Sequence, residues 1–350
     1  MRPAPTAFWI VDAIKAIASQ LIVWHHFAAY GPLARTVHPY AAQLMDWLYA
    51  DARQAVQAFL VLGGFLAARS LAPRPHAPCF DTSARGVAQL VWRRYVRLVR
   101  PYAVVLLLAI AAAALARQIL NDVDTPAVPA LLQLLAHILL IHDIVDVNSL
   151  SAGVWYVAID FQLYVVLLLL LWLAQVSADR YQVAMRWVAL LAVVGLIASS
   201  LLWFNRNPAM DEWALYFFGA YGLGVMVQWS SGLTRKHFWL TMVFSAVILA
   251  LALEWRSRLV VALFTALILS VGLHVKPVLN QRVHDVVAWL SRISYSVFLI
   301  HYPIILLIGS IFARLWPHHV EAHIAGLLAA WLLSLAGGAV LYQQVERTTR

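Results

Sequence analysis

Charged residues are scarce in this sequence. Asp, Glu, Lys and Arg together make up 12% of the 350 residues, whereas hydrophobic residues make up 63%. A soluble domain carries about twice that share of charged residues, so no soluble domain of normal size fits anywhere in the chain. Cysteine is almost absent as well, and with Cys79 alone no intramolecular disulfide forms. These shortages predict an all-α, polytopic membrane protein in a single domain over residues 1–350.

The charged residues that are present have an uneven distribution. The net charge is +9, and the basic residues lie mainly in short segments between apolar runs. That is the pattern of the positive-inside rule, in which cytoplasmic loops are rich in Lys and Arg. It accounts for the charge without a polyanion, so we expect no nucleic-acid partner.

Ten apolar runs are long enough to be read as membrane spans, since about 20 helical residues cross the hydrocarbon. They lie at about 8–30, 52–68, 101–115, 153–174, 187–204, 213–229, 238–253, 259–272, 287–312 and 322–342. We expect the third to open at Pro101, where a proline is tolerated, and residues 69–100 to form a basic cytoplasmic loop. The residues between the first two spans are also expected to be a loop.

The apolar segment Ala130–His142 is too short to cross, and we read it as re-entrant or interfacial. With ten crossings, both termini are cytoplasmic and Arg235 lies inside, while Asp122 and Asp211 lie outside. An eleventh crossing at Ala130–His142 would place Arg235 outside. The charges therefore favour ten spans in a multi-pass protein of the inner, cytoplasmic membrane.

The first span carries four ionisable residues, Asp12, Lys15, His25 and His26. Such groups are costly in lipid and usually face a protein interior or a water-filled path. Lys15 and His26 are eleven residues apart, which places them on one helix face about 16 Å apart, whereas His25 points roughly 100° away. We predict that His26 is catalytic. A surface ion pair between Asp12 and Lys15 is the structural alternative for those two residues.

The fourth span carries Asp160 in the sequence WYVAIDFQLY. With the predicted topology it lies roughly 10 Å below the outer surface, at a depth where it could meet His26. A carboxylate that orients an imidazole is a common general-base arrangement. The alternative is a buried hydrogen bond to Tyr164, Gln162 or Trp155 that only fixes packing.

Four arginines, Arg93, Arg94, Arg97 and Arg100, precede the third span. Guanidinium groups bind phosphates bidentately, so this cluster could hold the phosphates of a nucleotide-bearing donor. Juxtamembrane arginines also set topology and bind anionic membrane lipids, and the cluster alone does not separate these roles.

Late in the chain, the sequence SRISYSVFLIHYP places His301 near the middle of the ninth span. It either lines an active cavity with Ser294 and Tyr295 nearby or is a satisfied core residue. His319 and His323 have a spacing seen in metal sites, but no strong motif accompanies them, so we expect no metal.

Taken together in chain order, the motifs around His26, the arginine cluster, Asp160 and His301 resemble those of the membrane acyltransferase-3 family. Its members are integral-membrane O-acyltransferases that modify bacterial surface glycans. The similarity covers nearly the whole chain. The motif residues are Lys15 and His26 across a ten-residue spacer, Arg94 and Arg97, Trp155, Asp160, Gln162 and Tyr164, and Ser294, Tyr295, His301 and Pro303. Lys15 stands where arginine is common, Asp160 replaces the usual glutamate, and Gly63-Gly64 stands where serine-glycine is typical.

The resemblance implies an acyl-CoA donor, usually acetyl-CoA, on the cytoplasmic side and a glycan or lipid-linked glycan hydroxyl as acceptor, with no cofactor. It implies that the arginines hold the donor's phosphates, with Trp155, Tyr164, Ser294, Tyr295 and His301 also in the substrate site. His26 and Asp160 would activate the acceptor, and Lys15 would steady the donor or the oxyanion. Whether His26 is the base or is transiently acylated stays open, as do the acyl group, the acceptor and the oligomeric state.

A transporter or flippase for a glycan or lipid-linked intermediate is the competing class. In it the buried charges would form a proton or substrate path. This class predicts that neutralising the arginines disturbs only topology and that no acyl-CoA binds. Gly63-Gly64 in the second span predicts, in either class, that another helix or a ligand approaches the backbone closely.

Overall fold

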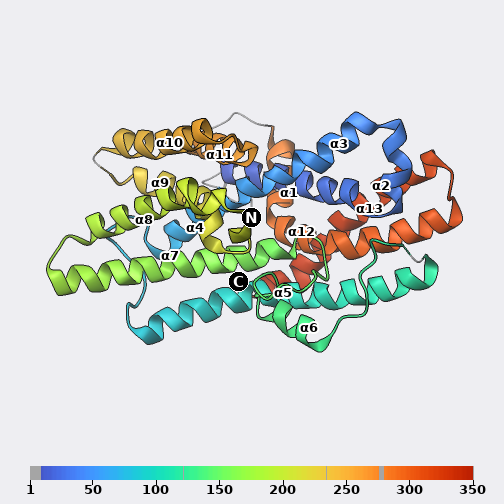
Figure 1. Ribbon diagram of the computed structural model, residues 1–350, viewed down its shortest axis with the longest axis horizontal. Coiled ribbons are helices and arrows are strands. Elements are labelled where there is room, and N and C mark those ends of the chain that lie inside the picture. Colours follow the sequence, from blue (N-terminus) through green and yellow to red (C-terminus); the bar gives the residue numbers. More distant parts are fainter. Residues whose placement is uncertain (1–8, 121, 234, 276–279, 350) are drawn as a thin grey trace. The chain divides into compact units, whose positions relative to one another are not determined.

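The computed structural model describes residues 9–120, 122–233, 235–275 and 280–349. Within these ranges every regular element is a helix, apart from one isolated bridge between Arg74 and Ala77 (Figure 1). The all-α prediction is confirmed for this part of the chain. The chain forms two compact units, unit 1 with Met1–Ala55, Val96–Val157 and Leu279–Arg350, and unit 2 with Val56–Tyr95 and Ala158–Val278.

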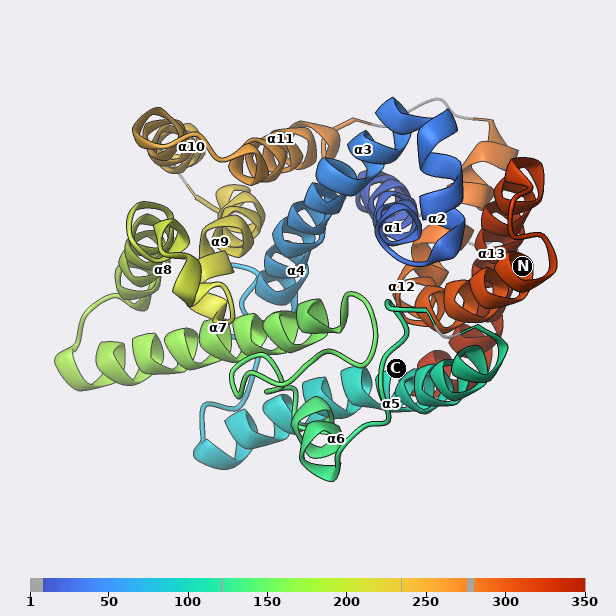
Figure 2. The same cartoon turned by 45° about the vertical axis from the view of Figure 1, so that its right-hand side comes forward.

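Unit 1 is built around the contact of the first helix with the long helix near the C-terminus. Its elements are α1 (Trp9–Ala29), α2 (Pro32–Val37), η1 (His38–Tyr40), α3 (Ala42–Ala50), η2 (Ala52–Ala55), most of α5 (Ala84–Ile119), α6 (Leu131–Ile138), α12 (Gln281–Leu315), α13 (Val320–Leu341), η5 (Tyr342–Glu346) and η6 (Arg347–Thr349). α12 packs against both α1 and α13 (Figures 1 and 2). Their shared core includes Val23, Phe27, Val297 and Leu327.

Unit 2 is built around α9 (Ala214–Ser230), which packs against α4, α8, α10 and α11. The other elements are α4 (Val56–Leu71), the first residues of α5, most of α7 (Val154–Tyr181), α8 (Met185–Leu202), η3 (Phe204–Arg206), η4 (Pro208–Met210), α10 (Lys236–Leu253) and α11 (Ser257–Gly272). α4 and α9 cross at glycines. A Cβ at Gly64 would lie 1.8 Å from the Tyr221 carbonyl oxygen, and one at Gly224 would lie 1.8 Å from that of Val61. The close helix approach predicted at Gly63-Gly64 is therefore confirmed.

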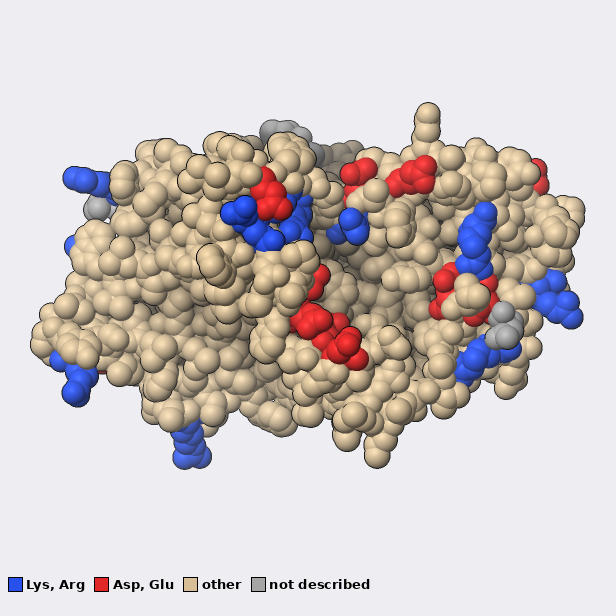
Figure 3. Space-filling model, in the orientation of Figure 1, with Lys and Arg blue, Asp and Glu red and all other residues tan. Residues whose placement is uncertain are grey.

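Six helices among the described residues are long and apolar enough to cross a membrane. They are Ala42–Leu71, Ala84–Ile119, Val154–Tyr181, Met185–Arg206, Gln281–Leu315 and Val320–Glu346. His237–Leu253 and Ser257–Gly272 are shorter apolar helices. On the face shown in Figure 3, charged side chains cover only small areas. The chain is a membrane protein; the count of ten spans and the side of the termini stay predictions.

Two boundaries differ from the sequence prediction. α5 begins at Ala84, and Pro101 lies inside it. A proline removes one backbone hydrogen bond, which a helix of 36 residues tolerates, so the arginine cluster is helical and not in a loop. The predicted loop after the first span contains α2 and α3. The first helix begins at Trp9, and Phe8, where the predicted span starts, lies outside the described residues.

Candidate active site

His26 and His301 form a buried pair in unit 1. The His26 Nδ1 atom lies 2.7 Å from the His301 Nε2 atom, and the ring centroids are 4.8 Å apart with planes only 5° from parallel. His26 is 6% exposed and His301 is fully buried. The pair joins two helices that are far apart in the sequence, α1 and α12. Sequence reasoning placed both residues in the site, but not in contact with each other.

The hydrogen bonds assign a tautomer to each ring. His301 Nδ1 lies 3.3 Å from the Val297 carbonyl oxygen, which only accepts, so His301 carries its proton on Nδ1. The neutral His301 ring then accepts at Nε2, and His26 Nδ1–H is the donor. His26 Nε2 consequently keeps its lone pair. A ring nitrogen of this kind is the basic atom of a general base.

Gly153 lies directly beside His26 and was not predicted as a site residue. It has φ +76°, which favours glycine, and a Cβ there would lie 3.0 Å from both His26 Cε1 and Phe298 Cζ. Gly153 thus avoids crowding the imidazole at Cε1, the carbon between its two nitrogens. The sequence signal was weak, because a glycine just before a helix has many causes.

The remaining polar residues of α1 have distinct partners. Asp12 accepts a hydrogen bond of 2.6 Å from the Ser291 hydroxyl of α12. Lys15 is half-buried, eleven residues from His26 on the same helix, which corresponds to about 16 Å. His25 lies 3.1 Å through Nδ1 from the Leu48 carbonyl oxygen. His25 therefore helps to hold α3, and its ring also lies beside that of His26, with the ring centroids 5.0 Å apart.

α12 also contacts the part of α5 that carries Arg97 and Arg100, the two arginines of the cluster that belong to unit 1. The Tyr295 hydroxyl donates to the Leu98 carbonyl oxygen at 3.0 Å, between the exposed residues Arg97 and Arg100. Tyr295 is six residues before His301, about 9 Å along the helix axis. Ser294 is buried, and its hydroxyl donates to the Ser291 carbonyl oxygen of its own helix.

Unit 2 contains a second cluster of predicted site residues. The Arg94 guanidinium donates to Asp160 at 2.5 Å and lies 5.1 Å from the centre of the Tyr164 ring. Asp160 is 7% exposed, so this ion pair is largely desolvated. A Cβ at Gly63 would lie 3.2 Å from both Asp160 Oδ1 and the Tyr221 ring. Gly63 thus leaves room beside the carboxylate.

The predicted residues therefore divide between the units. Asp160 and Tyr164 belong to unit 2 with Arg93 and Arg94, of which Arg93 is exposed. Trp155 belongs to unit 1, where its ring lies edge-to-face with that of Tyr156 at 6.3 Å. The predicted contact of Asp160 with His26 stays a prediction, and so does the use of Arg94 for phosphate binding.

A second histidine pair, His137 and His142, is buried in unit 1 with ring centroids 4.3 Å apart. His137 Nδ1 lies 2.7 Å from the Gln133 carbonyl oxygen, and His137 Nε2 accepts from the Leu150 amide at 3.1 Å. Burial lowers the pKa of each ring to about 4, so both are neutral at pH 7. His137 anchors the segment before α7. Among the described residues, no group of three or more His, Cys, Asp or Glu is arranged to hold a metal ion.

These features define a class, the integral-membrane proteins with a buried histidine pair between two helices. A comparison with protein families then identifies the chain as a member of the acyltransferase-3 family, since the family's sequence model, described as an acyltransferase domain, matches residues 8–343. The resemblance inferred from the motifs is confirmed, and the match runs across both units. Acyl transfer is thus the reaction that family membership supports. Neither the curated proteins nor the solved structures give a match.

Proposed function

We propose that this protein transfers an acyl group, most simply acetyl, from cytoplasmic acyl-CoA to a hydroxyl of a cell-surface or lipid-linked glycan, from a position in the inner membrane. The observation that carries the proposal is the 2.7 Å contact between His26 Nδ1 and His301 Nε2, from which the tautomers are assigned. Because His301 accepts the His26 Nδ1 proton, His26 Nε2 is free to accept the proton of a hydroxyl.

In the proposed reaction, His26 Nε2 takes the proton of the acceptor hydroxyl as its oxygen attacks the thioester carbonyl carbon. The carbon–sulfur bond then breaks, and the departing CoA thiolate receives the proton from His26. The acceptor leaves as an ester and His26 returns to its neutral form. No oxidant or further co-reactant is needed. His301 holds the imidazole in the productive tautomer throughout, the role that a carboxylate has in hydrolase triads.

The donor is proposed to bind at the Arg97 and Arg100 end of α5. Both side chains are exposed, and guanidinium groups match phosphate geometry. Tyr295 bonds to Leu98 between them and lies about 9 Å along α12 from His301. A donor held there by its phosphates could extend its thioester along α12 toward His26. Lys15 lies too far from His26 to contact the oxyanion, since that contact requires about 3 Å, so we assign it to the donor.

The proposal is tested with purified protein in detergent, using acetyl-CoA and succinyl-CoA and measuring both binding and turnover. His26→Ala is expected to lose about 10²–10⁴-fold in turnover while donor binding is kept. His25→Gln is the matched control, because His25 is the adjacent histidine but bonds to α3. Arg97→Ala is expected to weaken donor binding, with the exposed Arg314→Ala, at the far end of α12, as its control.

Three outcomes would contradict the proposal. Absence of CoA binding removes the donor site and leaves a transport activity to be assayed. Equal losses in His26→Ala and His25→Gln remove the catalytic role of His26. Equal effects of Arg97→Ala and Arg314→Ala mean that the arginine acts through overall charge and not by binding phosphate.

A further inference from the structure

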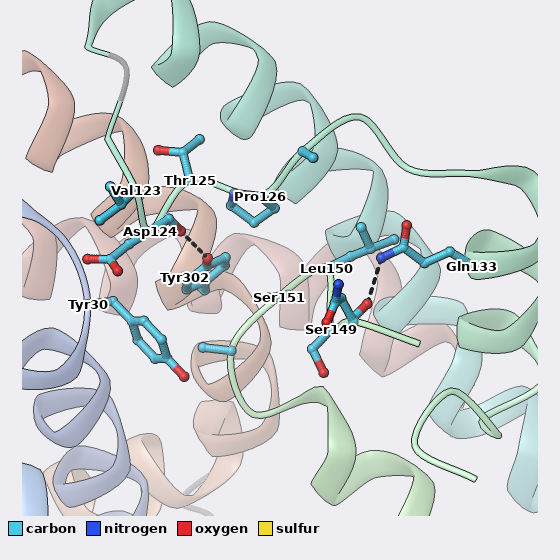
Figure 4. Close-up of a pocket in the computed structure, with 13 residues that line it drawn as sticks. Tyr30, Val123, Asp124, Thr125, Pro126, Gln133, Ser149, Leu150, Ser151 and Tyr302 are labelled. Atoms are coloured by element: carbon cyan, nitrogen blue, oxygen red, sulfur yellow. Dashed lines mark hydrogen bonds between the residues drawn. The ribbon is translucent and has the colours of Figure 1, made fainter. Parts of the chain in front are cut away.

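Unit 1 contains a cavity of about 500 Å³ close to the histidine pair. Its wall consists of Tyr30 at the end of α1, Tyr302 of α12, Gln133 of α6, and the segments 123–127 and 148–152 (Figure 4). We call it the acceptor pocket. Its volume lies in the range of about 300–1,000 Å³ that is usual for small-molecule sites.

The wall of the acceptor pocket combines polar and apolar side chains and is nearly uncharged. Hydroxyl groups come from Thr125, Ser149, Ser151 and the two tyrosines, and Tyr302 donates to the Asp124 carbonyl oxygen at 3.4 Å (Figure 4). Among the described residues that line it, Asp124 is the only charged one. A wall of this kind suits a ligand with many hydroxyl groups and no charge.

The charges around the pocket are already matched. The Asp124 carboxylate accepts a 2.9 Å hydrogen bond from the Gly31 amide and an ion pair from Arg35, which also pairs with Asp122. Arg117 donates to the Pro126 carbonyl oxygen. These arginines hold the 122–126 segment in place, and neither lines the cavity. A phosphate or carboxylate on the ligand would therefore find no basic partner in the wall.

Two connections link the pocket to the proposed base. The Tyr30 ring, which lines the pocket, lies 6.0 Å from the His26 ring and edge-to-face with Tyr302 at 5.8 Å. Ala152, also in the wall, precedes Gly153, whose position lies directly against His26, since an added Cβ there would be 3.0 Å from His26 Cε1. Tyr295, at the arginine end, and Tyr302 lie on opposite sides of His301 in the sequence of α12. The histidine pair thus stands between the proposed donor end and the pocket.

We propose, resting on the acyl-transfer function above, that the acceptor pocket binds one uncharged sugar ring of the acceptor and presents a hydroxyl to His26. The pocket discriminates against acidic sugars, because their carboxylate would lose water without gaining a cation. Tyr30 and Tyr302 supply flat amphipathic faces, and the serine and threonine hydroxyls supply hydrogen bonds.

The test compares Ala127→Trp with Val128→Trp. Ala127 is an exposed member of the wall, so tryptophan there fills the mouth of the pocket without disturbing a core, whereas the neighbouring Val128 is exposed and outside the wall. Acetyl transfer from acetyl-CoA is measured to a panel of neutral methyl glycosides and the corresponding uronic acids. The detergent must have no sugar headgroup, because such a headgroup would compete for the pocket.

We expect Ala127→Trp to raise the KM for neutral glycosides at least tenfold with donor Kd unchanged, and Val128→Trp to change neither. Wild type should prefer neutral glycosides over uronic acids at least tenfold in kcat/KM. Thr125→Val, which removes one hydroxyl at constant shape, should raise the acceptor KM about threefold or more.

The proposal is overturned if the two tryptophan variants behave alike, if acidic and neutral acceptors react equally, or if acetyl-CoA is hydrolysed but no neutral glycoside is acylated. If wild type neither binds nor turns over acetyl-CoA, the failure lies in the proposed function itself. The donor measurement therefore separates the two hypotheses.

Discussion

The chemistry proposed for His26 depends on a partner 275 residues later in the chain. An isolated neutral imidazole exchanges between two tautomers, and only one of them leaves Nε2 free. The Val297 carbonyl oxygen fixes His301, and His301 in turn fixes His26. The pair is buried, so water does not compete for these bonds. The orientation of the His26 ring and its tautomer come from the same two contacts.

Replacing His301 tests the orienting bond. His301→Leu leaves the His26 Nδ1–H buried without an acceptor, and we expect kcat to fall about 100-fold with little change in donor KM. His301→Gln offers a side-chain oxygen as acceptor and should recover much of that loss. Steady-state kinetics of both variants with acetyl-CoA is the measurement. A merely structural role for His301 would make the two variants equally impaired in kcat, in proportion to their loss of stability.

Gly153 gives a second test at the same position. Gly153→Ala introduces strain at a positive φ and brings a methyl group against His26, so both stability and activity should fall. Gly31→Ala is the matched control, because Gly31 has φ +87° with nothing within 4 Å of an added Cβ. Both variants should lose on the order of 1–3 kcal/mol in the free energy of unfolding. Only Gly153→Ala should lose activity beyond the fraction unfolded, and an equal loss in Gly31→Ala would refute the crowding of His26.

The sequence prediction of the site started from ionisable residues in apolar runs. Lys15, His26 and Asp160 were selected in this way, because such groups are costly in lipid, and their roles stay predictions. The pairing of Arg94 with Asp160 was not predicted, since each belonged to a separate motif with a separate expected role. Gly153 was missed because its effect depends on a contact with His26 that any side chain at this position would make and that glycine avoids. The spacing of residues within one helix does not indicate which residue of another helix each side chain contacts.

At the scale of elements, the periodicity and length of the apolar runs located the apolar helices. The assumptions that a helix starts at Pro101 and that the residues between two spans form a loop misplaced some boundaries. α5 continues through Pro101, so the arginines extend a helix instead of forming a loop. α2 and α3 occupy a predicted loop, because short helices of mixed polarity give no long apolar run. The crossing of α4 and α9 was signalled by Gly63-Gly64, although its partner Gly224 was not identified.

The α4–α9 crossing predicts a large difference between two glycine variants of unit 2. Gly64→Ala places a methyl group on the Tyr221 backbone and must push the helices apart, at a cost of about 3 kcal/mol or more. Gly195→Ala in α8 meets nothing within 4 Å and should stabilise its helix by up to about 1 kcal/mol. Apparent melting temperatures in detergent should thus move in opposite directions. Similar melting temperatures would show that the crossing adapts at little cost.

The histidine pair at α6 predicts a stability that depends on pH. Burial lowers the pKa of His137 and that of His142 from 6.5 to about 4. For His137, the hydrogen bond to Gln133 and the charge of Asp143 raise the pKa without offsetting burial, and His142 lowers it further. Above pH 6.5 the rings are neutral in both states. Between pH 6.5 and about 4 only the unfolded chain binds the protons, so stability falls as pH falls, by up to about 3 kcal/mol per ring.

The measurement is the apparent melting temperature in detergent from pH 7.5 to 4.5. His142→Phe removes one of the two titrations and should roughly halve the decline attributable to the pair. Stability at pH 7 should stay similar, because neither nitrogen of His142 has a hydrogen-bond partner among the described residues and the neutral ring forms no ion pair with Asp143, 3.4 Å away. The exposed His76→Gln is the control and should leave the decline unchanged. An unchanged slope in His142→Phe would mean that the ring does not titrate on unfolding.

At the scale of the whole molecule, the distribution of charge and the lengths of the apolar helices predict different numbers of membrane crossings. Length and composition identify six helices that could cross, whereas the basic segments agree with ten crossings and an excess of positive charge inside. The difference concerns α1 and the 16 to 18-residue helices α9, α10 and α11. Short apolar helices are tolerated in a membrane that thins locally or where flanking basic side chains reach the interface. The charge pattern is thus the stronger guide to sidedness.

The single cysteine allows a direct test of that topology. Cys79 is exposed, and with ten spans it lies on the cytoplasmic side, so a membrane-impermeant maleimide should label it in inside-out vesicles and not in intact spheroplasts. In a Cys79→Ser background, Ser231→Cys reports on the number of crossings before α10, since Ser231 is exposed and lies four residues before Arg235. Labelling of both Cys79 and Ser231→Cys from inside is the result that ten spans predict. With the N-terminus inside, labelling of Ser231→Cys from outside means an odd number of crossings before α10, either because α6 crosses in spite of its eight residues or because α9 does not cross. Asp211→Cys, predicted outside, is the control that shows labelling in spheroplasts.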